Sequence, residues 1–321
     1  MGSLVAVWSE RLALLLLWIV VVLVFTVLPA TGARFATLAT FGSIFGAGAV
    51  TVVLTLGLIV PGLGGDYDLS VAYNLTLSSI VLAELNVNLH VNIAIAAVIV
   101  IAVGIIAGIA NAIVSVKFKV DPFIATLGTG TVMAGIALWV SHSAVISGTS
   151  VGLSDIVVSD RWFGLPIEFY FALGLALVMS FAFAYLPSGR KLRYVGLQRD
   201  VARLTGVSVG RVRTTAFIVS GALSAVAGIM YTGNAGAADP TSGISLLLPA
   251  FAAAFLGATT IIPGQFNPLG SLIAVYFLGT GVTGLELLGA SSYIQDLFYG
   301  AALIIAVIIS GVLVRRRSAV S

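Results

Sequence analysis

A few charged residues divide this chain into long stretches that carry no charge at all. No charged side chain occurs between Arg11 and Arg34, or between Asp239 and Glu286. Only 8% of the 321 residues are charged and 60% are hydrophobic, whereas a soluble domain carries about 25% charged residues. Because a chain with so little polar surface needs lipid as its solvent, we predict an all-α, polytopic membrane protein.

The uncharged stretches predict about ten transmembrane helices in a single domain, residues 1–321, since a helix needs about 20 apolar residues to cross a bilayer. The spans are expected within 12–33, 35–65, 68–84, 93–116, 122–140, 167–186, 214–234, 239–286 (two) and 294–314. Pro263, Gly264 and Pro268 divide the pair in 239–286. Residues 141–166 are polar and predict an external loop with a short interfacial helix near Trp162. The third span is short, and whether it is broken or re-entrant stays open.

The distribution of basic residues predicts the orientation. With ten spans and the N-terminus inside, 13 of the 15 Lys and Arg residues lie on the inner side, and Arg34 and Arg161 lie outside. Loops on the cytoplasmic side of membrane proteins carry an excess of Lys and Arg. We therefore predict that both termini are cytoplasmic.

Nearly half of the positive charge lies in one inner segment, GRKLRYVGLQRDVARLTGVSVGRVR, residues 189–213, which contains seven basic residues and one acid, Asp200. Its apolar residues recur at helical spacing, as do two arginines that fall on another face. These residues are Leu197, Val201 and Leu204, and Arg199 and Arg203. Gly206 is expected to end this helix. The segment is either a loop that contacts anionic headgroups or a helix that docks into a cytoplasmic partner.

Several function classes find no support in the sequence. The chain has no cysteine and two histidines, His90 and His142, and it lacks GxSxG, HExxH and phosphate-loop motifs. We expect no enzymatic activity, no ATP hydrolysis and no metal or cofactor in this chain. The twelve acids fall at span ends or in loops, whereas an ion-driven carrier usually buries a carboxylate within the membrane. The energy for any transport is therefore expected to come from another subunit.

YVGLQRDVARLTGVSVGRVRTTAFIVSGALSAVAGI, residues 194–229, resembles a cytoplasmic segment and helix of the sugar-type ABC importer permeases, the family of ribose and xylose permeases (CUT2). The family pattern runs roughly Gly-Gly-Asn, two variable positions, then Ala-Ala-Arg-Leu-Ser-Gly-Ile. The chain matches it at Gly196, Ala202, Arg203, Leu204 and Gly206, with Thr205 and Val207 conservative. It departs from it at Leu197, Gln198 and Val201.

Four further stretches resemble the same family in the same order. They are GLGGDYDLSVA (62–72), VDPFIATLGTG (120–130), and the stretches 240–273 and 287–307. In 62–72 the chain has an extra residue, and Tyr67 interrupts the glycines that precede Asp68 in the family. Pro249, Pro263 and Pro268 are departures in 240–273. The resemblance covers most of the chain from residue 60 onward.

The resemblance implies the permease subunit of an ATP-driven importer for a monosaccharide or sugar alcohol, in the inner membrane of a bacterial cell. It implies a homodimer, cytoplasmic subunits that bind ATP and Mg²⁺, and an extracytoplasmic solute-binding protein. The segment 189–213 would then hold the coupling helix. Its implied coupling residues are Leu197, Arg199, Val201, Ala202, Arg203, Leu204 and Gly206. The solute, and pairing with a second copy or with a related permease, stay open.

A path for a sugar needs side chains that bond hydroxyl groups, because an unpaired buried hydroxyl costs about 1–3 kcal/mol. The candidates are Asp68, Ser70, Tyr73 and Asn74, with Asn111, Thr126 and Asn234 as secondary ones. Hydrogen bonding between helices is the alternative role for each, and Asp66 and Asp68 could instead lie among the inner headgroups. The alternative functions are an ion-coupled secondary transporter and an ABC permease for amino acids or nucleosides.

One internal similarity adds a structural hypothesis. IVPGLGGDYDLSVA (59–72) and IIPGQFNPLGSLIA (261–274) share a Pro-Gly start and a matched apolar end at equal spacing. They are either equivalent broken-helix elements in two halves of the bundle or a chance match in sequence of low complexity.

Overall fold

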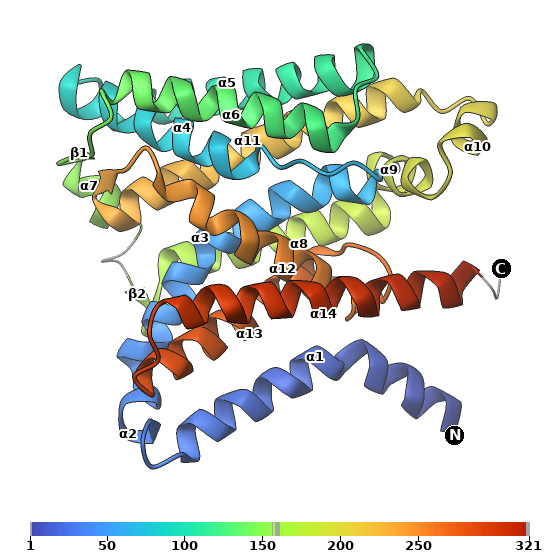
Figure 1. Ribbon diagram of the computed structural model, residues 1–321, viewed down its shortest axis with the longest axis horizontal. Coiled ribbons are helices and arrows are strands. Elements are labelled where there is room, and N and C mark those ends of the chain that lie inside the picture. Colours follow the sequence, from blue (N-terminus) through green and yellow to red (C-terminus); the bar gives the residue numbers. More distant parts are fainter. Residues whose placement is uncertain (1, 156, 158–160, 319–321) are drawn as a thin grey trace. The chain divides into compact units, whose positions relative to one another are not determined.

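A computed structural model describes residues 2–155, 157 and 161–318 (Figure 1). Contacts between residues divide the chain into two compact units. Unit 1 comprises Met1–Thr55, Arg161–Leu177 and Leu248–Ser321, and unit 2 comprises Leu56–Asp160 and Val178–Leu247. Two long helices, α3 (Leu38–Leu63) and α8 (Ile167–Tyr185), contribute residues to both units.

Unit 1 is built from helices near the two ends of the chain and a small hairpin. Besides parts of α3 and α8, it contains α1 (Gly2–Val27), α2 (Gly32–Phe35), β2 (Arg161–Trp162), β3 (Leu165–Pro166), α12 (Leu247–Gly257), α13 (Pro268–Leu287) and α14 (Tyr293–Ser318). Close packing joins α1 to α13, where the Trp18 Nε1–H donates to the Thr280 hydroxyl at 2.8 Å.

Unit 2 surrounds one short helix, α4 (Val71–Ala83), with longer ones. The other elements in chain order are η1 (Glu84–Asn88), α5 (Ile93–Ala112), η2 (Ile113–Lys117), α6 (Pro122–Val140), β1 (Ile146–Ser147), α7 (Val151–Ser154), α9 (Pro187–Leu197), α10 (Arg199–Leu204), α11 (Val209–Ala235), β4 (Ala237–Ala238) and η4 (Ser242–Leu246). Helix α4 packs against α5, α6 and α11 (Figure 1), and eleven of its residues are buried. Strands β1 and β4 pair antiparallel.

Each predicted span is helical in the structure. Among the described residues, seven helices are long and apolar enough to cross a membrane. The apolar segments Arg11–Val27 and Ser242–Gly257 are shorter, and α4 has 13 residues. The prediction of an all-α, polytopic membrane protein is therefore confirmed, while the count of ten spans and their orientation stay predictions.

The loop at 141–166 differs from the prediction near Trp162. The short helix in this region, α7, lies earlier, at Val151–Ser154, and Trp162 belongs to the hairpin of β2 and β3. The two residues between these strands, Phe163 and Gly164, both have positive φ angles, 50° and 83°. Two such residues in succession form the tight turn that suits a β-hairpin, so Trp162 itself belongs to a hairpin and not to the interfacial helix predicted near it.

The two similar stretches, 59–72 and 261–274, both contain an interruption between helices. Residues 64–70 separate α3 from α4, and residues 258–267 separate α12 from α13. In each break a short polar side chain accepts a bond from the start of the next helix: Asp68 from the Ser70 N–H at 3.0 Å and Asn267 from the Gly270 N–H at 2.7 Å. The shared local structure favours the hypothesis of equivalent elements over a chance match.

Candidate functional site

The basic segment forms two short helices rather than one. Helix α9 starts with Pro187 at its first turn and ends at Leu197, and Gln198 is extended, with φ −154° and ψ 102°. Helix α10 follows and ends at Leu204, and Gly206 has a φ of +83°. A left-handed residue after a helix is a common helix stop that glycine adopts without strain, so the predicted role of Gly206 as the end of the helix is confirmed.

The apolar stripe of this segment faces away from the rest of unit 2. Leu197 is 66% exposed, Val201 39% and Leu204 88%. The opposite face is packed: Val195 and Ala202 are buried in a cluster with Val209 of α11. The segment is thus held to α11 by one face and presents an exposed apolar stripe on the other. An exposed apolar stripe with charges around it is the form that a helix docking into a groove takes.

A buried carboxylate fastens this segment to the break between α3 and α4. Asp66 is 1% exposed and accepts from Arg199 Nη2 at 2.5 Å, from Arg213 Nε at 2.6 Å and from Arg213 Nη2 at 3.0 Å. Arg199 Nη2 also lies 2.9 Å from the Gly65 carbonyl oxygen. We name these three residues, Asp66, Arg199 and Arg213, the arginine bracket. Charge-assisted bonds of this kind are about twice as strong as neutral ones.

Backbone packing holds the same junction together. A Cβ atom added at Gly196 of α9 would lie 2.0 Å from the Leu63 carbonyl oxygen, and one added at Gly64 would lie 2.8 Å from the Leu192 side chain. Only glycine allows α9 to approach the end of α3 so closely. The glycine contact packs residues 63–64 against α9, and the arginine bracket bonds Asp66 to α10 and α11.

The structure changes the interpretation of the two arginines. The sequence placed Arg199 and Arg203 on one face, at the rim of a docking helix. Arg199 instead bonds Asp66 inside unit 2, because the break at Gln198 turns its side chain toward Gly65. Arg203 pairs with Asp200 at 3.1 Å, and both side chains are exposed. Exposed pairs of this kind contribute about 0–1 kcal/mol.

A second buried carboxylate, Asp68, lies at the centre of a hydrogen-bond network. Its Oδ1 accepts from the Ser70 N–H at 3.0 Å and the Ser70 hydroxyl at 2.6 Å, and its Oδ2 accepts from the Ser220 hydroxyl at 2.8 Å. Asn111 Nδ2 donates to the Ser70 hydroxyl oxygen at 2.7 Å, and Thr129 donates to the Asn111 side-chain oxygen. The bonds therefore run in one direction, from Thr129 through Asn111 and Ser70 to Asp68. We name these five residues the Asp68 network.

The Asp68 network joins four elements of unit 2 and supplies hydrogen-bond donors to both oxygens of a buried carboxylate. Its residues come from the break before α4, from α5, from α6 and from α11. Asp68 also precedes the N-terminus of α4, where unpaired backbone N–H groups favour an anion. The prediction placed the acids at span ends or in loops, and Asp66 and Asp68 lie in the break between α3 and α4, where both are 1% exposed.

The other predicted path residues lie around this network or away from it. Thr126 accepts from the Leu69 N–H at 3.0 Å, and Asn74 donates to the Gly221 carbonyl oxygen at 3.0 Å. Tyr73 packs on Gly130 of α6, where an added Cβ would lie 2.5 Å from its ring. Asn234 is exposed near the end of α11. The structure therefore brings Asp68, Ser70 and Asn111 into one network and leaves Asn234 apart.

Sequence reasoning missed Asp66, Arg213, Ser220 and Thr129 as members of these clusters. For Asp66 and Arg213 the one available signal was charge balance. Segment 189–213 holds seven basic residues and one acid, which indicates that a carboxylate from another segment pairs with some of them. Ser220 and Thr129 lie within small-residue stretches that packing alone explains. No pattern marked them in advance.

Substituting Asp68 with asparagine is expected to lower the free energy of unfolding by about 1–3 kcal/mol, because it replaces an acceptor oxygen by an amide N–H₂ that faces a hydroxyl donor of Ser70 or Ser220. Thermal unfolding of the detergent-solubilised protein measures this effect. The matched control is Asp200→Asn, which removes an acid whose side chain is 92% exposed and should change little. Equal midpoints for the two variants would show that the Asp68 network does not stabilise unit 2.

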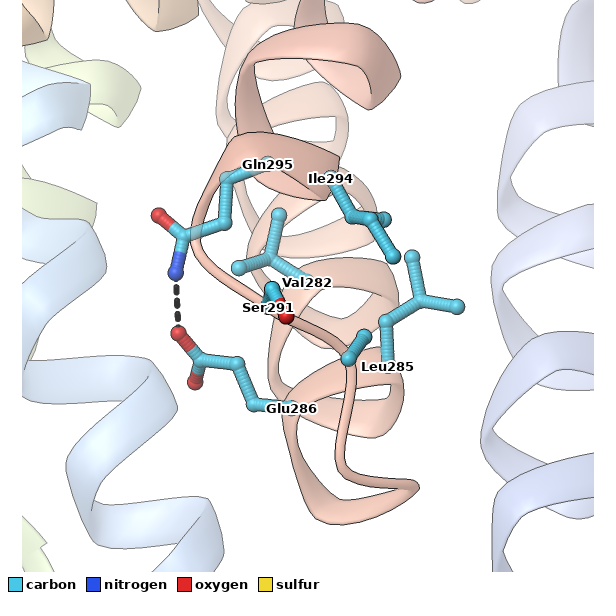
Figure 2. Close-up of a pocket in the computed structure, with 7 residues that line it drawn as sticks. Val282, Leu285, Glu286, Ser291, Ile294 and Gln295 are labelled. Atoms are coloured by element: carbon cyan, nitrogen blue, oxygen red, sulfur yellow. Dashed lines mark hydrogen bonds between the residues drawn. The ribbon is translucent and has the colours of Figure 1, made fainter.

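A shallow hollow lies elsewhere, at the turn between α13 and α14 in unit 1. Figure 2 shows its lining, in which Gln295 donates to the Glu286 carboxylate across the turn. The remaining lining residues are Val282, Leu285, Ala290, Ser291 and Ile294. Because this hollow contains none of the predicted path residues, it adds nothing to the candidate site.

The chain matches one protein-family model over residues 34–307, and that family is described as branched-chain amino acid transport system / permease component. The ribose import permease RbsC of Bacillus subtilis is 31% identical over 84% of this chain and 83% of its own length. The D-allose permease AlsC of Escherichia coli K12 is 29% identical over 85% and 83%. No solved structure matches the chain significantly.

A third relative, the autoinducer 2 permease LsrC of Salmonella choleraesuis, is 27% identical over 94% of this chain and 86% of its own length. These relatives and the family match cover the α4 region, the basic segment and the network residues together. ABC permeases are transport subunits and not enzymes, and separate subunits of the importer hydrolyse ATP. The chain belongs to the permease components of ABC importers, and within them to the sugar-type family.

Proposed function

We propose that this chain is the membrane-spanning subunit of an importer that moves a monosaccharide or sugar alcohol by alternating access. The main support for this proposal is that the chain belongs to the sugar-type permease family. The named relatives transport ribose, allose and autoinducer 2, which are small and rich in oxygen. The hydroxyl and amide groups around Asp68 are of the chemical type that such solutes bond.

The proposal includes the arrangement in the membrane. Ten spans, with both termini in the cytoplasm, put segment 189–213 on the inner side, where basic residues are favoured. The protein would lie in the inner membrane of a bacterial cell as a homodimer. An extracytoplasmic solute-binding protein would deliver the solute to the outer side.

The proposal assigns energy supply to two cytoplasmic subunits that bind ATP and Mg²⁺, with no cofactor in this chain. Helix α10 would dock into a groove of such a subunit, with its Val201 and Leu204, and Leu197 at the end of α9, as the apolar anchors. Their exposure supports this role, because the three apolar side chains of this basic segment are 66%, 39% and 88% exposed. Ala202 would orient the helix from its buried side, and Gly206 would end it.

Asp68 is the residue that an ion-coupled carrier would use, since it is a carboxylate buried among oxygen-bearing side chains. Its oxygens already accept three bonds from Ser70 and Ser220. This occupancy favours a structural role for Asp68 over ion coupling. Uptake measurements distinguish transport driven by ATP from transport driven by an ion gradient.

The test is uptake into proteoliposomes that contain this chain, its ATPase subunits and its solute-binding protein. The probes are labelled D-ribose, D-allose and ribitol, with L-leucine and adenosine representing the alternative permease classes. We expect uptake of a sugar or polyol that requires ATP and persists when the proton and sodium gradients are collapsed. Uptake driven by either gradient without ATP, or uptake of leucine or adenosine alone, would contradict the proposal.

A further inference from the structure

The break between α3 and α4 holds two buried carboxylates that are only two residues apart and face different partners. Asp66 bonds the arginines of the basic segment, and Asp68 bonds the residues around α4. Both side chains are 1% exposed. Segment 66–68 is thus anchored at one end to α10 and α11 and at the other end to the core of unit 2.

We propose that the arginine bracket is the link through which the position of α9 and α10 sets the position of the N-terminus of α4. This inference rests on the proposed function, in which α10 docks to an ATPase subunit. The bracket makes Asp66, Arg199 and Arg213 positioning residues, which act on the transport path through α4 and do not touch the solute.

The first step of the argument is that the bracket spans three separate parts of the chain. Arg199 begins α10, Arg213 lies in the first turns of α11, and Asp66 lies in the break. Three charge-assisted bonds meet on one carboxylate that solvent does not reach. Removing one partner of a buried charged pair costs much more than an exposed pair contributes, so α10 cannot move away without pulling Asp66 or breaking the bracket.

The second step is that the break transmits a displacement over a short distance. The residue after Asp66, Tyr67, is followed directly by Asp68, whose carboxylate accepts from the N-terminus of α4. A shift of Asp66 therefore reaches α4 through two peptide units. Because α4 is buried against α5, α6 and α11, a change at its start alters how those helices meet.

The third step comes from the sequence. Asp66 stands in the stretch where this chain has an extra residue relative to the family, and Arg199 occupies one of the two variable positions of the family pattern. Asp66 and Arg199 therefore both lie outside the positions at which this chain matches the family pattern.

The experiment uses the complete importer with a single cysteine in place of Tyr73 on α4, which is straightforward because the chain has no native cysteine. The rate of maleimide labelling is compared between the nucleotide-free and vanadate-trapped complexes. We expect the two rates to differ by about tenfold, a typical allosteric coupling. With Asp66→Asn or Arg199→Gln added, we expect the difference to vanish while the ATPase still binds and hydrolyses ATP.

Two further variants separate positioning from general stability. Asp66→Glu keeps the charge and should retain most of the difference, and Arg211→Gln, which removes an exposed arginine two residues from Arg213, should retain all of it. If Asp66→Asn does not fold, Arg199→Gln still tests the link, since Arg213 then remains on Asp66.

The outcomes distinguish this inference from the proposed function. Unchanged nucleotide dependence in Asp66→Asn and Arg199→Gln would overturn the inference, as would equal labelling rates in the two states of the parent complex. Failure of the ATPase to assemble with the parent protein would instead overturn the proposed function.

Discussion

Replacing Leu204 with aspartate is expected to abolish transport and to weaken binding of the ATPase subunit by about 30-fold or more. Leu204 is 88% exposed at the end of α10, so the substitution leaves unit 2 intact but places a charge in a docking groove. An apolar anchor at the centre of an interface contributes about 2 kcal/mol or more, and each 1.4 kcal/mol is a tenfold change in affinity. Co-purification of the ATPase with the tagged variant measures the loss.

The matched control for Leu204→Asp is Leu89→Asp. Leu89 is also exposed, at 61%, but it lies in the connection between η1 and α5, on the side that we predict to be external. This control should retain the ATPase. Equal retention of the ATPase by both variants would show that the apolar stripe of α10 is not the docking surface.

Replacing Gly221 with leucine is expected to lower the stability of unit 2 by about 3 kcal/mol or more, the upper part of the range for overpacked interiors. Helices α5 and α11 cross with backbones in contact: a Cβ added at Gly221 would lie 2.2 Å from the Gly104 carbonyl oxygen, and one added at Gly108 would lie 2.4 Å from the Phe217 carbonyl oxygen. Backbone atoms cannot move aside as a side chain can. Small residues permit this approach within a membrane.

The measurement for Gly221→Leu is the yield of monodisperse protein in detergent and its thermal midpoint. Gly135→Leu on α6 is the matched control, because nothing lies within 4 Å of a Cβ added at Gly135. The control should be as stable as the parent. A Gly221→Leu protein with the parent's midpoint would contradict the close crossing of α5 and α11.

The helices could be predicted from the sequence because lipid imposes a simple requirement on them. Long stretches without charge have to become helices in a bilayer, since no other open structure satisfies their backbone polar groups. Glycines and prolines marked the breaks, as at Gly206, and the break near Pro263 and Pro268 divides α12 from α13 as expected. The hairpin at Trp162 was not predicted, because its turn depends on two positive φ angles. One of these is at Phe163, a residue type whose preferences do not indicate such an angle.

The site could be predicted only in part. Asp68, Ser70 and Asn111 were chosen as polar residues in apolar surroundings, and the structure joins them. Their partner Ser220 lies 152 residues from Asp68, and no periodicity reports such a distant contact. Arg199 was assigned to the surface because helical spacing pairs it with Arg203, but the break at Gln198 decides where its side chain points, and that break followed from no recognised signal.

The measurement that tests the central claim most directly is crosslinking from a single cysteine at position 204 in the assembled importer. With Leu204→Cys in the otherwise cysteine-free chain, we expect a crosslink to the cytoplasmic ATPase subunit and labelling by a membrane-impermeant maleimide only in inside-out vesicles. Labelling of this cysteine from the external side, or an assembled complex in which it never reaches the ATPase, would contradict the account.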